Sequence, residues 1–402
     1  MSVDLECPEN LRLEKSMNHS YYLRSREQRY RTVSECVGPS TSPSFQFKFP
    51  FQDLPRDCML KIFSFLGPME RGVAGQVCLE WNKLVKNSSL WSSVDFTVIP
   101  MCCKNHLEPN CTKMCYTSYK KRVKNFMKYL VNIRPVLKRL RLAFDIGDKE
   151  DGWLEHLNGF LSSAHLQELD VLYLTWHETP AKPYFGGVNL TWTTSDTKEL
   201  MQKQKYRQRL FVNLFIALTA RCSGITKLSI PFEWSQRTLQ ALVRLQRLDS
   251  LVLEKYYMYQ PLPQDSVDLL FHSLPQLRHL MLEVWTPSAP GLQLYNITSK
   301  ALQYLDISQC RGFYLQSLHT PQLEVFKLSR HPFSGPLISS PDGMNIPCVY
   351  HVIREGCPQL KQINEHILSR DWRLMIYPEL QVVLAAVCAC RQHKSSGWPN
   401  AM

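Results

Sequence analysis

A leucine pattern recurs along a long part of the chain and restricts the folds that the chain can adopt. The unit is Leu-x-x-Leu-x-Leu, in which other apolar residues often replace a leucine, and neighbouring copies mostly begin 21 to 29 residues apart. Such a period is typical of a solenoid, because a short strand and its return segment bury no core alone and must stack on their neighbours. The copies begin at Leu137, Leu166, Ile225, Leu248, Leu277, Leu302, Leu323 and, in degraded form, Leu360.

The pattern predicts an α/β fold in which parallel strands line the concave face of a curved solenoid and helices cover its convex face. Side chains alternate along a strand, so the residues between the leucines are expected to face outward on the concave side. Their mixed charges and interspersed aromatic residues suit a protein or peptide better than a phosphate backbone, although a merely solvated face is the alternative. The candidate target-binding residues on this face are Arg139, Arg141, His279, Tyr304 and Lys327, and the pattern also places Glu168 and Asp170 there. A further candidate, Trp285, begins a longer insertion that is expected to emerge at the rim of the solenoid.

A second apolar pattern comes before the repeats. Pro55 suits the first turn of a helix, and apolar residues follow it at helical spacing as far as Leu66. A second helix is predicted from Met69 to Lys86, and Leu90 begins a third element. Three short helices bury little core alone, so we expect their apolar surface to need a partner.

This segment resembles an F-box, the helical module that docks a protein onto the Skp adaptor of a cullin-RING ubiquitin ligase. The motifs that carry the resemblance are Leu54-Pro55-x-Asp57, Ile62-Phe63, Leu66, Val77-Cys78-x-x-Trp81 and Leu90-Trp91. Together with the repeats, they make the chain similar to F-box proteins with C-terminal leucine-rich repeats. The resemblance implies that Trp81 and Trp91 hold the module together and that the adaptor is bound by Leu54, Pro55, Ile62, Phe63, Leu66, Val77 and Cys78.

The resemblance also implies a function, that of a non-catalytic substrate receptor in an SCF-type ubiquitin ligase. The partners would be the Skp adaptor, through it the cullin and RING subunits, and an unidentified protein that is ubiquitinated and degraded by the proteasome. Such a receptor is expected in the cytoplasm, the nucleus or both. No membrane partner is expected, because no apolar run is long enough to span a bilayer.

Two alternatives remain open. The chain could be a scaffold that binds the adaptor without directing degradation. It could also be a basic solenoid associated with nucleic acid, which its net charge of +12 permits. The basic residues are densest from Lys120 to Arg141, where interleaved apolar residues predict an amphipathic helix rather than a nucleic-acid-binding tail, so nucleic acid is the less favoured partner.

Composition and pattern divide the chain into five segments. We expect a disordered basic leader (1–44), an F-box (45–98), a cysteine-rich linker with a basic amphipathic helix (99–134), the solenoid (135–370), and a C-terminal cap and tail (371–402).

The 14 cysteines are scattered along a chain without a recognisable secretory signal, which predicts free thiols in a reducing compartment. One group near the start of the linker could hold a structural zinc ion tetrahedrally, with a loop of reduced cysteines as the alternative. Cys388 and Cys390 have too few neighbours in the sequence to predict a site. No other cofactor and no catalytic motif is recognised, so no enzymatic activity is expected. The linker group consists of Cys102, Cys103, His106, Cys111 and Cys115.

Overall fold

The chain divides into two units, and each is described by itself. The first unit ends at Leu54 and the second begins at Pro55. Within the first unit, the 3-10 helix η4 (Phe51–Asp53) comes directly before Leu54. The computed structural model describes residues 51–100, 113–144, 152–175, 194–257, 262–285, 293–329, 346–390 and 393.

Short helices open the second unit. They are α1 (Arg56–Ser64), α2 (Pro68–Ala74), α3 (Leu79–Val85) and the 3-10 helix η5 (Ser88–Trp91). The prediction of one continuous helix from Met69 to Lys86 is wrong, because α2 ends at Ala74 and a new helix begins after Cys78. The Cys78 sulfur accepts a hydrogen bond from the Trp81 N–H at 3.4 Å, which caps the start of α3.

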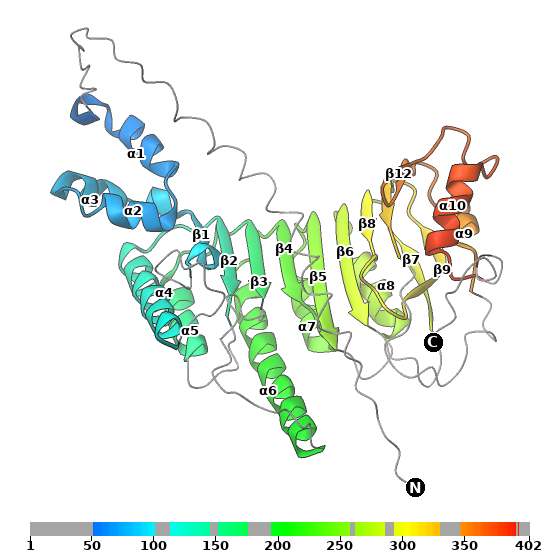
Figure 1. Cartoon of the computed structure of the whole chain (residues 1–402), viewed down its shortest axis with the longest axis horizontal. Coiled ribbons are helices and arrows are strands. Elements are labelled where there is room, and N and C mark those ends of the chain that lie inside the picture. The colour runs from blue at the N-terminus through cyan, green and yellow to red at the C-terminus, as the bar shows by residue number, and fades with distance from the viewer. Residues whose placement is uncertain are drawn as a thin grey trace, which may run out of the picture. The chain divides into compact units, whose positions relative to one another are not determined.

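A long parallel sheet follows these helices (Figure 1). Its strands are β1 (Ser93–Asp95), β2 (Arg139–Ala143), β3 (Val171–Thr175), β4 (Lys227–Pro231), β5 (Ser250–Tyr257), β6 (His279–Trp285), β8 (Tyr304–Asp306), β10 (Val325–Lys327), β11 (Gln362–Ile363) and β12 (His366–Ile367). Among the described residues these ten strands lie in that order in one sheet, and each pair is parallel apart from the antiparallel pair β11 and β12.

Apolar residues form a continuous row at one level of the sheet, and this row is the centre of the core. Each member pairs with the corresponding residue of the next strand, and all of them are buried. The stacked leucine repeats predicted from the sequence are therefore confirmed. The row consists of Val94, Leu140, Leu172, Leu228, Leu251, Leu280, Leu305, Phe326 and Ile363.

One predicted copy is displaced by three residues. Leu172, and not Leu169, pairs with Leu140. Because Leu166, Leu169 and Leu172 follow one another at equal intervals, two overlapping triplets satisfy the leucine pattern equally well. The placement of Glu168 and Asp170 on the open strand face is consequently wrong. Val171 and Tyr173 occupy these positions.

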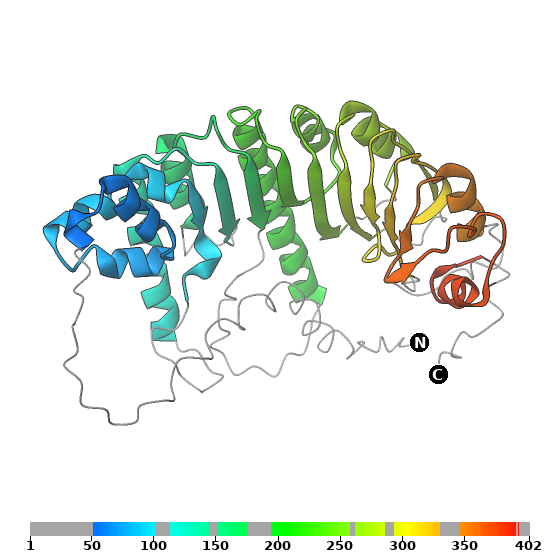
Figure 2. The same ribbon diagram turned by 90° about the horizontal axis from the view of Figure 1, so that it is seen from above.

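The helices after β1 are α4 (Lys113–Ile133), α5 (Trp153–Ser163), α6 (Thr194–Thr219), α7 (Gln236–Leu242), α8 (Gln264–Ser273), α9 (Val349–Gly356) and α10 (Pro378–Val387). Helices α7 and α8 lie against one face of the sheet, and the opposite face of strands β2 to β6 is not covered by them (Figures 1 and 2). None of the described helices combines the length and hydropathy that a bilayer span requires.

Two return segments form strands, although helices are predicted in general for the convex face. β7 (Leu294–Thr298) comes before β8, β9 (Tyr314–His319) comes before β10, and the two pair in parallel as a separate small sheet. Tyr295 of β7 is fully buried, and its ring stacks on that of Phe313 with 4.2 Å between the centroids. Residues alternate between buried and exposed along β7, which favours a strand with one covered face over a helix.

Candidate functional site

Large apolar side chains are exposed on and between helices α1, α2 and α3. Phe65 follows α1 and is 77% exposed, Val73 in α2 is 66% exposed, and Leu79 at the start of α3 is 84% exposed. Met69 lies one helical turn before Val73, so both are on the same side of α2. Exposed apolar groups concentrated on so small a module indicate a surface that another protein covers.

The predicted adaptor-binding residues mostly lie at the surface of these helices. Val77 is 62% exposed, Pro55, Ile62 and Cys78 are also exposed, and Leu66 is partly exposed. In the first unit, Leu54 is partly exposed and donates its N–H to the Phe51 carbonyl oxygen at 3.3 Å.

Phe63 differs from the other predicted residues. It is only 1% exposed, and its ring meets the edge of Trp81 with 5.2 Å between the centroids. It therefore lies in the core of the module, where its side chain supports the helices from within. The exposed phenylalanine is Phe65, two residues later. On so short a helix, the apolar spacing alone does not decide which of the two faces the core.

Arg71 connects the helices of the module from inside. Its Nε donates to the Phe63 carbonyl oxygen at 3.2 Å and its Nη2 to that of Ser64 at 3.0 Å, while Nη1 donates to the Leu90 carbonyl oxygen. One buried guanidinium thus donates to carbonyl groups at the end of α1 and in η5. Nothing in the apolar pattern of the sequence indicates this role.

Trp91 joins the short helices to the first strands of the sheet. Its indole N–H donates to the Val85 carbonyl oxygen at 2.7 Å, and its ring lies 5.5 Å from that of Phe126 and 5.3 Å from that of Tyr129, both on α4. Val94 follows three residues later and enters the apolar row of the sheet. The helical module therefore continues directly into the first strand of the solenoid.

A first cluster of predicted target-binding residues lies near β2, on the sheet face opposite α7 and α8. Arg139 and Arg141 are both exposed, with Leu140 buried between them. The Arg141 guanidinium lies 5.9 Å from the centre of the Tyr173 ring on β3, and its Nη1 lies 3.9 Å from Asp95 Oδ2 on β1. This part of the face presents positive charge beside an aromatic ring.

The remaining predicted residues form a second cluster, farther along the sheet. His279 pairs with Tyr304 across β6 and β8, and its Nδ1 lies 3.6 Å from Asp249 Oδ2. Lys327 on β10 pairs with Asp306, and its Nζ lies 3.1 Å from Glu365 Oε1. Strands β3, β4 and β5 separate the two clusters.

Trp285 ends β6, and the Arg311 guanidinium carbon lies 4.2 Å from the centre of its ring.

Four of the five residues of the zinc site predicted in the linker, from Cys102 to Cys111, lie outside the described residues. The fifth, Cys115, is partly exposed in the first turns of α4.

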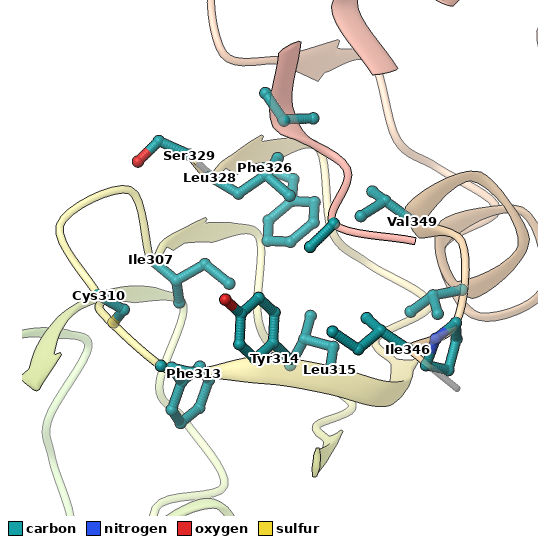
Figure 3. A pocket seen from close by; sticks show the side chains of 15 residues that line it. Ile307, Cys310, Phe313, Tyr314, Leu315, Phe326, Leu328, Ser329, Ile346 and Val349 are labelled. Atoms are coloured by element: carbon teal, nitrogen blue, oxygen red, sulfur yellow. The ribbon is translucent and has the colours of Figure 1, made fainter. Parts of the chain in front are cut away.

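A small pocket lies among β9, β10, the first part of α9 and the end of α10 (Figure 3). Its walls are mainly apolar and include Phe313, Tyr314, Phe326 and Val349. The cavity volume is about 50 Å³. Pockets that hold small-molecule ligands usually measure roughly 300–1,000 Å³, so this one does not indicate a ligand site.

Comparisons with known proteins agree with the geometry of the helical module. A family described as F-box-like matches residues 51–97. F-box/LRR-repeat protein 12 of Bos taurus is 43% identical over 51 residues, which is 13% of this chain and 16% of that relative. The match therefore spans only a small part of the relative. Residues 51–97 are an F-box-like domain, and the mostly parallel sheet that follows it is a leucine-rich-repeat solenoid.

Proposed function

We propose that this chain is a substrate-recognition subunit of an SCF-type ubiquitin ligase. The F-box-like domain would bind the Skp adaptor, and the uncovered face of the sheet would hold a target protein. The observation that carries the proposal is the group of exposed apolar side chains on the F-box-like domain, which includes Phe65, Val73, Val77 and Leu79. Burying an apolar surface of this kind is the main driving force of most protein associations.

The proposed adaptor surface consists of side chains that are exposed or partly exposed to solvent in the chain without a partner. Phe65 takes the contact role that the sequence assigned to Phe63, because Phe63 is enclosed in the core. Met69 and Val73 join the surface from α2, and Leu79 joins it from α3. Pro55, Ile62, Leu66, Val77 and Cys78 keep their predicted roles, as does Leu54 from the first unit.

The receptor would act by proximity and would perform no bond chemistry of its own, as is typical of F-box proteins. A target held on a rigid support experiences a high effective concentration of the ubiquitin-charged enzyme, which the other ligase subunits supply. The link from Trp91 to α4 serves this purpose, because it couples the F-box-like domain to the first part of the solenoid. Ubiquitination of the target, in the cytoplasm or the nucleus, would then lead to its degradation.

The two clusters on the sheet are the proposed target contacts. Arg139 and Arg141 stand beside Tyr173, a combination that suits an acidic segment of a protein with apolar or aromatic neighbours. His279, Tyr304 and Lys327, with Trp285 at the end of β6, would contact a second part of the same target.

Binding of purified Skp adaptor to the full-length chain tests the proposal. We expect Val77→Asp to weaken binding about ten- to a hundredfold, because about 1.5–3 kcal/mol of apolar burial is lost for one side chain of this size. Isothermal titration calorimetry measures the change in Kd.

The matched control is Val382→Asp on α10, where the wild-type side chain is 70% exposed and lies outside the F-box-like domain. It introduces the same charge at a valine of similar exposure and should leave the Kd unchanged. Equal weakening by both variants, or no binding by the folded wild-type chain, would refute the proposed function.

A further inference from the structure

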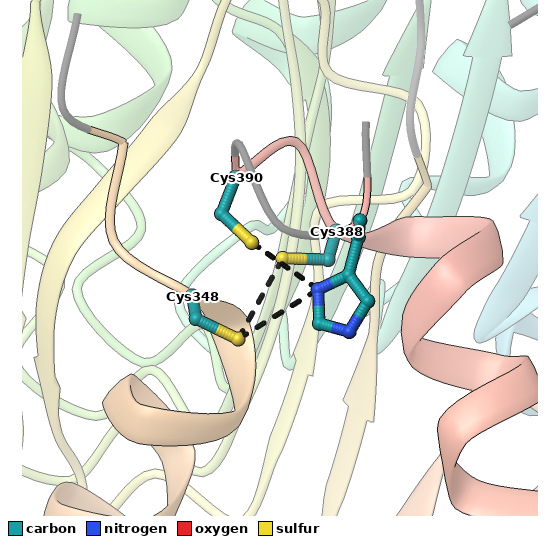
Figure 4. A group of neighbouring side chains, drawn as sticks. Cys348, Cys388 and Cys390 are labelled. Atoms are coloured by element: carbon teal, nitrogen blue, oxygen red, sulfur yellow. Dashed lines mark hydrogen bonds between the residues drawn. The ribbon is translucent and has the colours of Figure 1, made fainter. Parts of the chain in front are cut away.

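Three thiols and one imidazole meet where the start of α9 lies beside the end of α10 (Figure 4). They belong to Cys348, Cys388, Cys390 and His393, and all four candidate ligand atoms lie within 4.8 Å of one another. Cys388 and Cys390 are buried, whereas Cys348 is partly exposed. The sequence did not predict this group because Cys348 lies 40 residues before Cys388.

Three of the distances within the group are close to the edges of a metal-centred tetrahedron. With Zn–S bonds of about 2.3 Å and Zn–N bonds of about 2.0–2.1 Å, two sulfur ligands lie roughly 3.8 Å apart and sulfur and nitrogen roughly 3.6 Å apart. Here the sulfurs of Cys348 and Cys388 are 4.0 Å apart. His393 Nδ1 is 3.8 Å from the Cys348 sulfur and 3.2 Å from the Cys390 sulfur.

Two of the four ligands are placed by helix ends. Cys348 is the residue before the first turn of α9, and Cys388 is the residue after the last turn of α10. The Val349 N–H points at the Cys388 sulfur at 3.4 Å, and the His393 N–H donates to the Cys390 carbonyl oxygen at 3.2 Å. Backbone N–H donors to sulfur stabilise a thiolate ligand.

Two other uses of the same thiols fit less well. A disulfide requires the sulfurs to be about 2.05 Å apart, and the three cysteines are free. A two-iron cluster divides its ligands between two metal ions, whereas these four ligand atoms all lie within 4.8 Å of one another. Three thiolates and one imidazole are a common ligand set of structural zinc.

We propose that Cys348, Cys388, Cys390 and His393 bind one zinc ion, which ties α9 to α10 and closes the C-terminal end of the solenoid. Four protein ligands complete the tetrahedron, so the ion has a structural role and no open position for catalysis. The thiols lose their protons on binding. Terminal repeats need such a cap, because nothing stacks on their outer side. Val349, Val387 and Ala389, which adjoin the ligands in the chain, also line the apolar pocket, so the ion would hold that wall in place.

Metal analysis of the purified full-length chain tests this site. Zinc per chain is measured by mass spectrometry for the wild type, for Cys348→Ser/Cys390→Ser and for Cys102→Ser/Cys103→Ser. The last variant is the control, because the linker cysteines are a separate candidate for zinc binding. We expect the first double variant to lose one equivalent of zinc relative to the wild type. Unchanged zinc content in that variant would overturn the proposal.

A second variant keeps the test decisive if Cys348→Ser/Cys390→Ser fails to fold. His393→Cys retains four soft ligands and should still bind one metal ion at the site. After Co²⁺ replaces zinc, the added thiolate should strengthen the sulfur-to-cobalt charge-transfer absorption. A cobalt spectrum identical to that of the wild type would contradict ligation by His393. A disulfide between Cys348 and Cys388 in anaerobically purified protein would overturn the site as a whole.

Discussion

The guanidinium carbon of Arg71 lies 5.3 Å from the centre of the Trp91 ring, inside the F-box-like domain. Burial lowers the pKa of Arg71 from its usual value, but an arginine guanidinium keeps its charge in a folded protein. The Arg71 side chain donates to carbonyl groups in α1 and in η5, and Trp91 in turn packs on α4. These two residues connect the proposed adaptor surface to the repeats.

Replacing Arg71 by lysine should loosen the F-box-like domain. The lysine ammonium group keeps the charge but lacks the planar arrangement of N–H donors that reaches the carbonyl oxygens of Phe63, Ser64 and Leu90. One buried carbonyl left without a donor costs about 2 kcal/mol, so proteolytic cleavage between residues 56 and 91 should accelerate about thirtyfold. Arg56→Lys on the exposed start of α1 is the control and should be cleaved at the wild-type rate. Cleavage of Arg71→Lys at the wild-type rate would contradict the role of Arg71.

Two glycines should respond to alanine in opposite directions. A Cβ at Gly72 would meet nothing within 4 Å, and this exposed position is interior to α2. We therefore expect Gly72→Ala to raise the free energy of unfolding of the domain by about 0.5–1 kcal/mol. At Gly356 a Cβ would lie 1.5 Å from the Leu318 carbonyl oxygen, so α9 would have to move away from β9.

Gly356→Ala should accordingly cost about 1–3 kcal/mol, in the range of other overpacked positions, or prevent folding of the C-terminal end. Thermal melting of both variants beside the wild type checks the pair. A wild-type melting temperature in Gly356→Ala would show that α9 and β9 are less closely packed than described.

Cysteine alkylation should report adaptor binding. Cys78 is exposed within the proposed adaptor surface, whereas Cys310 is buried and its pKa is raised to about 12 by that burial. Iodoacetamide reacts with accessible thiolates, so Cys78 should be modified in the free chain and Cys310 should not. Saturating Skp adaptor should slow modification of Cys78, measured by peptide mass spectrometry. Undiminished labelling of Cys78 in the complex would show that Cys78 lies outside the surface that contacts the adaptor.

Charge reversal on β2 should separate target recognition from adaptor binding. Arg139→Glu/Arg141→Glu places acidic groups on the sheet face without touching the buried Leu140. Proteins whose ubiquitination rises with the wild-type chain in cells should no longer respond to this variant, although adaptor affinity should be unchanged. Lys121→Glu/Lys128→Glu, at two exposed positions of α4, alters the net charge equally and should retain the wild-type response.

The outcome of these variants also distinguishes the alternatives. A chain that binds the adaptor but raises ubiquitination of no protein would be a scaffold. Loss of function in the α4 variant, together with steeply salt-dependent binding of RNA or DNA, would favour the nucleic-acid alternative.

The fold could be predicted largely because the solenoid repeats one simple rule. A residue such as Leu251 is buried by the strands on either side, and each neighbour offers another apolar residue at the same level. The rule lost its precision where leucines follow one another at three-residue intervals, from Leu166 to Leu172, and the predicted register slipped there. The leucine pattern also predicted no strand at Val94, because tryptophan and phenylalanine replace the leucines around β1.

The sites were less predictable because they depend on packing between distant segments. Phe63 and Phe65 are both apolar and two residues apart, and only the arrangement with Trp81 decides that Phe63 is inside. Cys348 and Cys388 become neighbours through the packing of α9 and α10, a relationship that local spacing does not contain. Conversely, the closely spaced linker cysteines, from which a zinc site was predicted, lie mostly outside the described residues.

Hydrogen exchange of the full-length chain, with and without purified Skp adaptor, tests whether α1, α2 and α3 bind the adaptor. We expect a stable complex in which protection from exchange appears in α1, α2 and α3, around Phe65, Val73 and Leu79, and is absent from strands β2 to β8. Absence of a complex, or protection of the sheet with α1 to α3 unchanged, would contradict it.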